Sequence, residues 1–172
     1  MKEETLNRYA SQLLRLLDRV SPPETVSAHC DIPCGIYDPH TAQIGALTVL
    51  RMNQLMGQVD PNADKAAANS FGRYVTVKEE HAEVVKKELD ILWHDYFKPE
   101  HLDKYPDLHQ TFWDATKLAS KCKQTFDEAA ATDLLAATNR IAEIFWDTKG
   151  VPTRKAGSNQ AVGGELVYVD NK

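Results

Sequence analysis

Four stretches of the chain between residues 40 and 149 repeat apolar side chains at the three- and four-residue spacing of one helix face. This pattern constrains the fold more than any other feature of the sequence. The stretches cover residues 40–56, 70–97, 106–122 and 127–149, and proline or glycine separates them at Gly57, Pro61, Pro99, Gly150 and Pro152. Amphipathic helices joined by short connections predict an all-α protein with an antiparallel up-and-down four-helix bundle over residues 40–150.

The segments on either side of the predicted bundle have a different character. Residues 3–19 form another amphipathic helical stretch, and residues 20–28 follow it as a polar connector that contains two prolines and ends in small residues. A connector of this kind is a good protease substrate. Residues 151–172 are polar and rich in glycine, and only Glu165–Val169 has the residue pattern of a strand. We therefore expect a cleavable pro-segment over residues 1–28 and a polar C-terminal tail.

Composition argues against several classes of protein. The 172 residues include 20 Lys and Arg against 25 Asp and Glu, and the net charge of −5 argues against a dedicated nucleic-acid binder. No apolar run is long enough to span a membrane. Three cysteines do not make a disulfide-stabilised secreted scaffold, and residues 3–19 lack the apolar core of a secretion signal. We expect a cytoplasmic protein that binds neither nucleic acid nor membranes.

Metal sites are common inside helical bundles, but the usual sequence motifs for them are missing here. A di-iron bundle needs Glu-x-x-His pairs, and no glutamate stands three residues before any of these histidines: His81, His94, His101 and His109. Neither a His-Glu-x-x-His zinc motif nor a glycine-rich phosphate loop occurs. We interpret His40, His94, His101 and His109 as packing or surface residues, and Cys122 as a half-buried free thiol.

Potential metal ligands concentrate instead in residues 29–39, HCDIPCGIYDP, which we call the hook. His29, Cys30 and Cys34 lie within six residues of one another, in a segment without helical or strand periodicity. Two thiolates this close can bind a soft or borderline metal ion, and a histidine can add a nitrogen ligand. The spacing alone leaves open a redox-active or merely exposed thiol pair.

The position of the hook favours the metal interpretation. It follows the cleavable connector directly, so cleavage after Ala28 would free the α-amine of His29. That amine, the amide of Cys30 and the two sulfur atoms can form a flat set of two nitrogens and two sulfurs, with the imidazole above it. Flat donor sets of this kind suit Ni(II) or Cu(II) rather than zinc.

The hook closely resembles the nickel-binding hook of the nickel superoxide dismutase family, whose signature is His-Cys-Asp-x-Pro-Cys-Gly-x-Tyr-Asp-Pro. Every specified position matches, and LWHDYFKPEHLDKYPDLHQ (residues 92–110) and IAEIFWDTKG (residues 141–150) extend the resemblance over about residues 29–150. The resemblance implies a proenzyme that a protease cleaves before His29, with one nickel ion per subunit and assembly as a homohexamer. The implied reaction converts two superoxide anions to dioxygen and hydrogen peroxide by Ni(III)/Ni(II) cycling.

The resemblance also implies roles for single residues. It assigns His29, Cys30 and Cys34 as nickel ligands, and their thiolates would stabilise the higher oxidation state. It implies that Asp31 holds the hook, that Tyr37 and Tyr96 border the metal and order the small anion, and that Lys98 lies near the approach to it. Local charge matters because residues 29–150 contain 13 basic and 19 acidic side chains, a net charge of −6. Any attraction of an anion must therefore be local.

One departure from the family pattern concerns the support of the axial histidine. Family members carry a Glu on the first helix and an Arg on the second, and the matching positions here are Gly45 and His81. Our hypothesis is that His81, or water beside Gly45, takes over part of this support; a solvated surface histidine is the alternative. The missing pair is also the one feature that favours a non-catalytic nickel or copper carrier. A thiol redox protein that uses Cys30 and Cys34 without metal is a third possibility.

Overall fold

The structure is a computed structural model that describes residues 34–170. Residues 1–33 lie outside the described residues, and with them the predicted helix over residues 3–19, the predicted cleavage site, His29, Cys30 and Asp31. Residues 171–172 lie outside as well. The chain divides into two units, residues 1–34 and 35–172, and the description below concerns the second unit together with Cys34 taken by itself.

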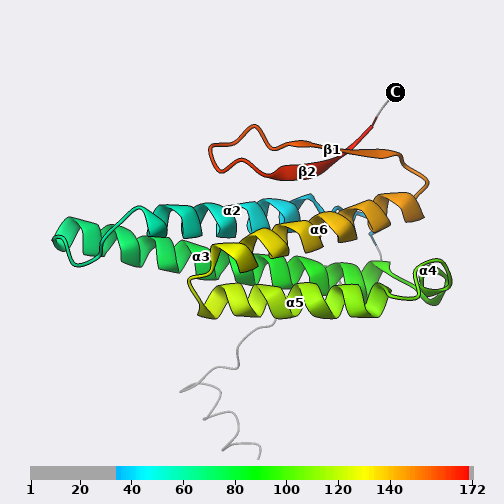
Figure 1. Ribbon diagram of the computed structural model, residues 1–172. Helices are drawn as coiled ribbons and strands as arrows, with labels where there is room; N and C mark the ends of the chain where they lie inside the picture. The colour runs from blue at the N-terminus through cyan, green and yellow to red at the C-terminus, as the bar shows by residue number, and fades with distance from the viewer. Residues whose placement is uncertain (1–33, 171–172) are drawn as a thin grey trace, which may run out of the picture. The chain divides into compact units, whose positions relative to one another are not determined.

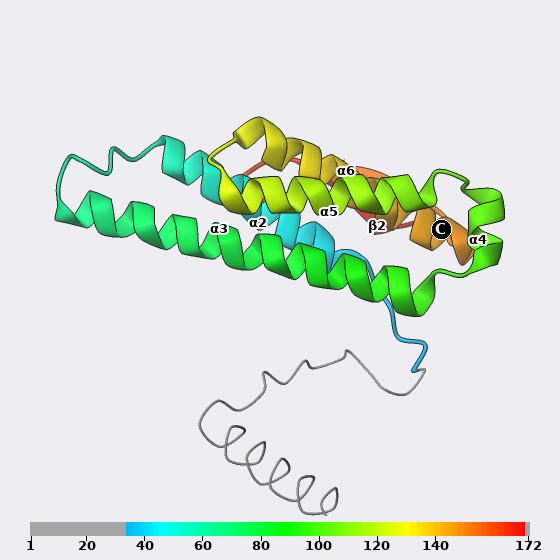
Figure 2. The same cartoon turned by 90° about the horizontal axis from the view of Figure 1, so that it is seen from below.

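Most of the described chain is helical, as predicted. The elements in order are α2 (His40–Gly57), α3 (Lys65–Ile91), a π-helical turn η1 (Leu92–Tyr96), α4 (Pro99–Lys104), α5 (Leu108–Gln124), α6 (Glu128–Thr148), β1 (Thr153–Gly157) and β2 (Glu165–Val169). Helices α2, α3, α5 and α6 form the bundle: each packs against the next along the chain, and α6 closes onto α2 (Figure 1; Figure 2 shows the same bundle from below). The prediction of an up-and-down helical bundle is confirmed.

Two aspartates fix where the longest helices begin. The Asp64 side chain accepts a hydrogen bond from the Ala67 amide (2.8 Å), and the Asp127 side chain accepts one from the Ala130 amide (2.9 Å). Each carboxylate thereby satisfies an amide that the first helical turn leaves without a partner. The cap at Asp64 lets α3 begin at Lys65, five residues before the start predicted from apolar spacing.

The stretch predicted as one helix over residues 70–97 ends differently from the expectation. Its last turn widens into η1, where the Phe97 amide bonds to the Leu92 carbonyl five residues earlier (3.0 Å). Single π-helical turns of this kind occur often at functional sites. The short helix α4, which begins at Pro99, was not predicted. Both features lie in the segment that connects α3 to α5.

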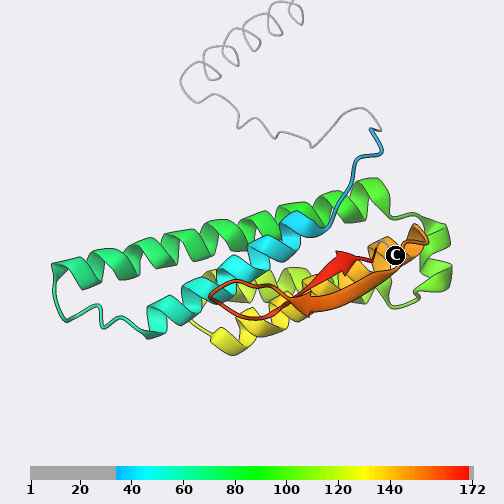
Figure 3. The same ribbon diagram turned by 90° about the horizontal axis from the view of Figure 1, so that it is seen from above.

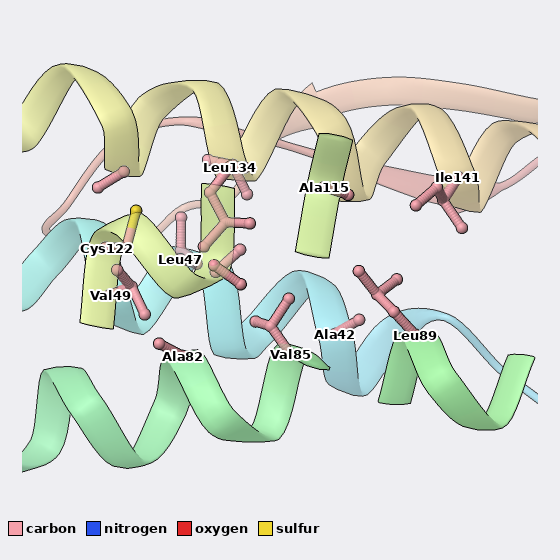
Figure 4. Close-up of a cluster of buried hydrophobic side chains, with 14 of the residues drawn as sticks. Ala42, Leu47, Val49, Ala82, Val85, Leu89, Ala115, Cys122, Leu134 and Ile141 are labelled. Carbon is pink, nitrogen blue, oxygen red and sulfur yellow. The ribbon is translucent and has the colours of Figure 1, made fainter. Parts of the chain in front are cut away.

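Small side chains let the helices of the bundle approach one another closely. Figure 4 shows the core between them, with Ala42 from α2, Ala82 from α3 and Ala115 from α5 among the larger Leu, Val and Ile side chains. Cys122 of α5 points into the same core and is fully buried, so the expectation of a half-buried thiol is wrong.

Residues 153–169 form an antiparallel β-hairpin, of which the sequence indicated only the second strand. The register runs from Thr153 opposite Val169 to Gly157 opposite Glu165. The hairpin lies over α2 and α6, on the side away from α3 and α5 (Figures 1 and 3). The Asn139 amide of α6 donates to the Glu165 carbonyl (2.8 Å) and accepts from Gln43 of α2 (2.8 Å), so buried hydrogen bonds join the three elements.

Candidate functional site

The structure places Tyr37 and Tyr96, two of the predicted site residues, in contact at one end of the bundle. Their ring centroids are 5.7 Å apart, with an angle of 55° between the ring planes. Tyr37 lies three residues before α2, and Tyr96 is the last residue of η1. Both side chains are half-buried. Residues far apart in the sequence thus meet at one place in the fold.

Other aromatic rings and one cation surround Tyr96. Its ring lies 4.5 Å from the ring of Phe145, 5.1 Å from that of Phe97 and 5.5 Å from that of His101, which stacks on it at 14°. The Lys149 ammonium lies 5.4 Å from the Tyr96 ring centroid and 4.5 Å from that of Phe145. At these distances the negatively charged face of an aromatic ring attracts a cation. Sequence reasoning missed Lys149, although it lies in the segment IAEIFWDTKG that carried the resemblance.

The hydroxyl group of Tyr96 is held by the end of α6. It lies 2.7 Å from Oγ1 of Thr148, and Thr148 Oγ1 in turn donates to the Phe145 carbonyl at 2.7 Å. Gly150 ends the helix at this point with φ +68°, and its amide bonds to the Asp147 carbonyl (3.0 Å). Glycine adopts this left-handed conformation without strain, which fixes where the last turn of α6 stops. Thr148 was likewise not predicted as a site residue.

Lys98 is exposed at the N-terminal end of α4 and lines a small recess of about 190 Å³ together with Trp93, Phe97, Pro99 and Leu102. Its backbone amide donates to Nδ1 of His101 at 3.1 Å. His101 therefore connects the start of α4 to the Tyr96 ring on which it stacks. This agrees with the interpretation of His101 as a packing residue rather than a metal ligand.

Gly45 of α2 packs against the backbone of α3 at His81. A Cβ atom at Gly45 would lie 2.9 Å from Cγ2 of Val85 and 3.3 Å from the His81 carbonyl oxygen. The two helices are therefore too close here for a larger residue. Nδ1 of His81 bonds to the Val77 carbonyl (2.9 Å), so this nitrogen carries a proton and only Nε2 remains for another partner. Along α3, His81 lies roughly 22 Å before Tyr96.

The aromatic residues of α5 separate into a packing group and an exposed one. Trp93 of η1 packs against His109 and Phe112 of α5, with ring centroids 5.5 Å and 5.2 Å away. Phe112 is buried. Trp113 remains exposed, with the Lys117 ammonium 4.4 Å from its ring centroid.

The described residues do not bring a set of metal-ligating side chains together. Within residues 34–170, no three His, Cys, Asp or Glu side chains are grouped as metal ligands. Burial raises the pKa of the Cys122 thiol to about 11, so it stays protonated near neutral pH and is a poor ligand. Cys34 is a free, exposed cysteine. The donors that the hook adds to it, a second thiol and the nitrogens of His29 and Cys30, form a set whose chemistry fits nickel.

None of the helices between residues 34 and 170 is both long and apolar enough to cross a membrane.

Comparison with known proteins gives one consistent result. A family model described as nickel-containing superoxide dismutase matches residues 24–149. The curated superoxide dismutase [Ni] of Streptomyces coelicolor is 42% identical over 136 residues, which are 78% of this chain and 98% of that protein. The Streptomyces seoulensis protein of the same name is 40% identical over 135 residues, again 78% and 98%. A solved structure of native nickel superoxide dismutase aligns with a TM-score of 0.64 and 40% identity, over 71% of this chain and 99% of that one.

Proposed function

The chain belongs to the nickel-containing superoxide dismutase family, and from this membership we propose which of its residues carry out the reaction. The family activity makes the protein an oxidoreductase, with superoxide as substrate and nickel as cofactor. The bound nickel ion supplies the one-electron exchange with superoxide. The protein must position the ion, admit a small anion and manage two protons, because two superoxide anions and two protons give one dioxygen and one hydrogen peroxide.

His29, Cys30 and Cys34 are the proposed nickel ligands. The support is the donor chemistry of the hook and the fact that residues 34–170 contain no competing group of three metal-ligating side chains. Cleavage before His29 would add its α-amine to the donor set, so the first 28 residues act as a pro-segment in this proposal. A processing protease is then a required partner.

Tyr37 and Tyr96 are the proposed border of the nickel site, and their contact at 5.7 Å is the observation that carries this proposal. Two phenol rings that meet at the end of the bundle can limit access to a small anion and hold an ordered water through their hydroxyl groups. Asp31 holds the hook in this proposal, and Lys98 provides a positive charge on the approach. His81 can support the axial histidine through Nε2 only where that histidine lies well away from Tyr96, because His81 lies roughly 22 Å before Tyr96 along the helix. His81→Ala tests this support, and an unchanged turnover and an unchanged spectrum of the oxidised enzyme would contradict it.

Assembly as a homohexamer and a cytoplasmic location complete the proposal. Exposed Trp113 is a candidate for a subunit contact because a half-exposed indole is costly to leave in water. A non-catalytic nickel or copper carrier is the alternative, and family membership does not favour it.

The decisive experiment compares two forms of the protein. A form that begins at His29 and the full-length chain from Met1 are loaded with nickel, and superoxide consumption is measured for each. We expect turnover only in the form with the free His29 amine. Nickel bound without turnover would support the carrier, and nickel-independent disulfide exchange would support the thiol redox protein.

Cysteine variants provide the matched control. Cys34→Ser should abolish nickel binding and turnover, whereas Cys122→Ala should retain both because Cys122 is buried in the core and protonated. Equal loss of nickel in both variants would contradict the proposed ligand set.

A further inference from the structure

The hydroxyl group of Thr148 stands between two oxygen atoms. It lies 2.7 Å from the Tyr96 hydroxyl and 2.7 Å from the Phe145 carbonyl oxygen. A threonine hydroxyl has one proton to donate, and a carbonyl oxygen can only accept. The proton of Thr148 therefore points to Phe145. The Tyr96 hydroxyl must then be the donor in its bond with Thr148.

The end of α6 explains why the Thr148 hydroxyl keeps donating its hydrogen bond to the Phe145 carbonyl. In a continuing helix, the Lys149 amide would bond to this carbonyl, but here it bonds to Trp146 at 3.1 Å. The amides of Gly150 and Val151 also turn to other carbonyls, those of Asp147 (3.0 Å) and Trp146 (2.9 Å). The Phe145 carbonyl is one of the last four of the helix, which commonly lack amide partners. The Thr148 hydroxyl replaces the missing donor.

We propose that Thr148 is a positioning residue: its oxygen accepts the hydrogen bond from the Tyr96 hydroxyl. Tyr96 can then act only as a hydrogen-bond acceptor toward substrate or water. This inference rests on the proposed function, because it matters for the reaction only if Tyr96 borders the nickel site. A phenol oxygen that has donated its proton can still accept a hydrogen bond from water or from a protonated product. It cannot donate one to superoxide without breaking the bond to Thr148.

The consequence concerns the protons of the reaction. Two superoxide anions take up two protons as one is oxidised to dioxygen and the other is reduced to hydrogen peroxide. With the Tyr96 proton held by Thr148, both protons must come from solvent water or from another group. Tyr96 then orders the proton-carrying water as an acceptor, and its own O–H bond remains intact throughout.

The test uses the nickel-loaded mature enzyme and four variants: Thr148→Val, Thr148→Ser, Tyr96→Phe and Thr132→Val. Valine copies the shape of threonine without the hydroxyl, and serine restores the hydroxyl. Thr132 is the matched control, because it makes the same kind of bond to a carbonyl of α6, that of Glu128 (3.0 Å), on an exposed turn. The probe is azide, a small anion with the same charge as superoxide, and the measurement is its inhibition constant.

Thr148→Val should free the Tyr96 proton for the anion and lower the inhibition constant for azide about threefold to tenfold. Thr148→Ser and Thr132→Val should match the wild type, and Tyr96→Phe should not weaken azide binding. If Tyr96→Phe weakens azide binding by threefold or more while Thr148→Val has no effect, Tyr96 donates to the anion and the proposal is overturned.

A spectroscopic measurement separates this inference from the proposed function. The tyrosine Fermi doublet in ultraviolet resonance Raman spectra reports whether a phenol donates or accepts a hydrogen bond, and subtraction of Tyr96→Phe isolates the signal of Tyr96. A donor signature in the wild type and in Thr148→Ser, lost in Thr148→Val, supports the bond direction. A signature unchanged in Thr148→Val overturns it. If the signature behaves as expected but no variant alters azide binding or turnover, the placement of Tyr96 at the nickel site is wrong, and the catalytic part of the inference falls with it.

Discussion

The ammonium group of Lys78 on α3 lies 2.7 Å from the carbonyl oxygen of Cys122 in the last turn of α5. It also donates to the carbonyls of Lys123 (3.1 Å) and Thr125 (2.6 Å). One buried cation thus replaces the amides that a helix end lacks and meets the negative end of the helix dipole. Burial lowers the pKa of Lys78, because removal from water disfavours the charged ammonium group. The three carbonyl oxygens act against this effect by accepting hydrogen bonds from that group.

Replacement of Lys78 by methionine should lower the free energy of unfolding by about 2–4 kcal/mol, because three carbonyl oxygens at the end of α5 lose their donor. Urea denaturation followed by circular dichroism measures the change. Lys117→Met is the control, since Lys117 is exposed and lies over the Trp113 ring. Equal stability of the two variants would show that the carbonyls find water instead.

The buried thiol of Cys122 predicts a loss of stability at alkaline pH. Burial raises its pKa in the folded protein from 9.0 to about 11, so the folded state holds this proton more tightly than the unfolded state. Its contribution is complete below pH 9 and is lost as the pH rises to about 11. The free energy of unfolding should therefore fall by about 2–3 kcal/mol more in the wild type than in Cys122→Ala over this interval. Parallel pH profiles for the two proteins would contradict the shifted pKa.

Gly164, immediately before β2, should be the most sensitive glycine of the hairpin. Its φ is +73°, and an added Cβ would lie 3.0 Å from Leu135 and 3.3 Å from Leu47. Gly164→Ala should therefore cost about 2–3 kcal/mol through backbone strain and overpacking, measured by thermal unfolding. Gly163 has φ +75° but open space around it, so Gly163→Ala should cost about 1 kcal/mol from strain alone. A similar loss in both variants would mean that the hairpin shifts away from α2 and α6.

The contrast between the bundle and the hairpin shows what the sequence could predict. The four bundle helices carry apolar residues at regular spacing, and this periodicity located α2, α5 and α6 to within two residues, whereas α3 begins five residues earlier than predicted. The strand β1, Thr153–Gly157, shows no regular alternation of buried and exposed side chains. The position of the hairpin depends on contacts such as the Asn139 bond to Glu165 of β2, which links residues 26 positions apart. No local pattern reports such a contact.

The candidate site divides in the same way. The ligand types and spacing of the hook, and the two tyrosines, were accessible from the sequence because they carry a motif. Thr148 and Lys149 were missed because their roles depend on where α6 ends and on how far it lies from η1. Threonine and lysine near a helix end are ordinary residues. Only the 2.7 Å bond to Tyr96 and the ring contact of the ammonium separate them from others of their type.

Local positive charge near the two tyrosines leads to the last prediction. Residues 29–150 carry a net charge of −6, yet the substrate is an anion, so attraction must come from single cations near the site. Lys149 lies 5.4 Å from the Tyr96 ring centroid, and Lys98 begins the segment after η1. Lys149→Met and Lys98→Met should each lower kcat/KM severalfold at low ionic strength, and the loss should shrink as added salt screens the charge. Lys123→Met removes an equal charge that pairs with Glu83 (2.9 Å), and it should leave kcat/KM unchanged. If all three variants lower kcat/KM equally, the effect comes from net charge rather than from a cation placed beside Tyr96, and steering at this end of the bundle is refuted.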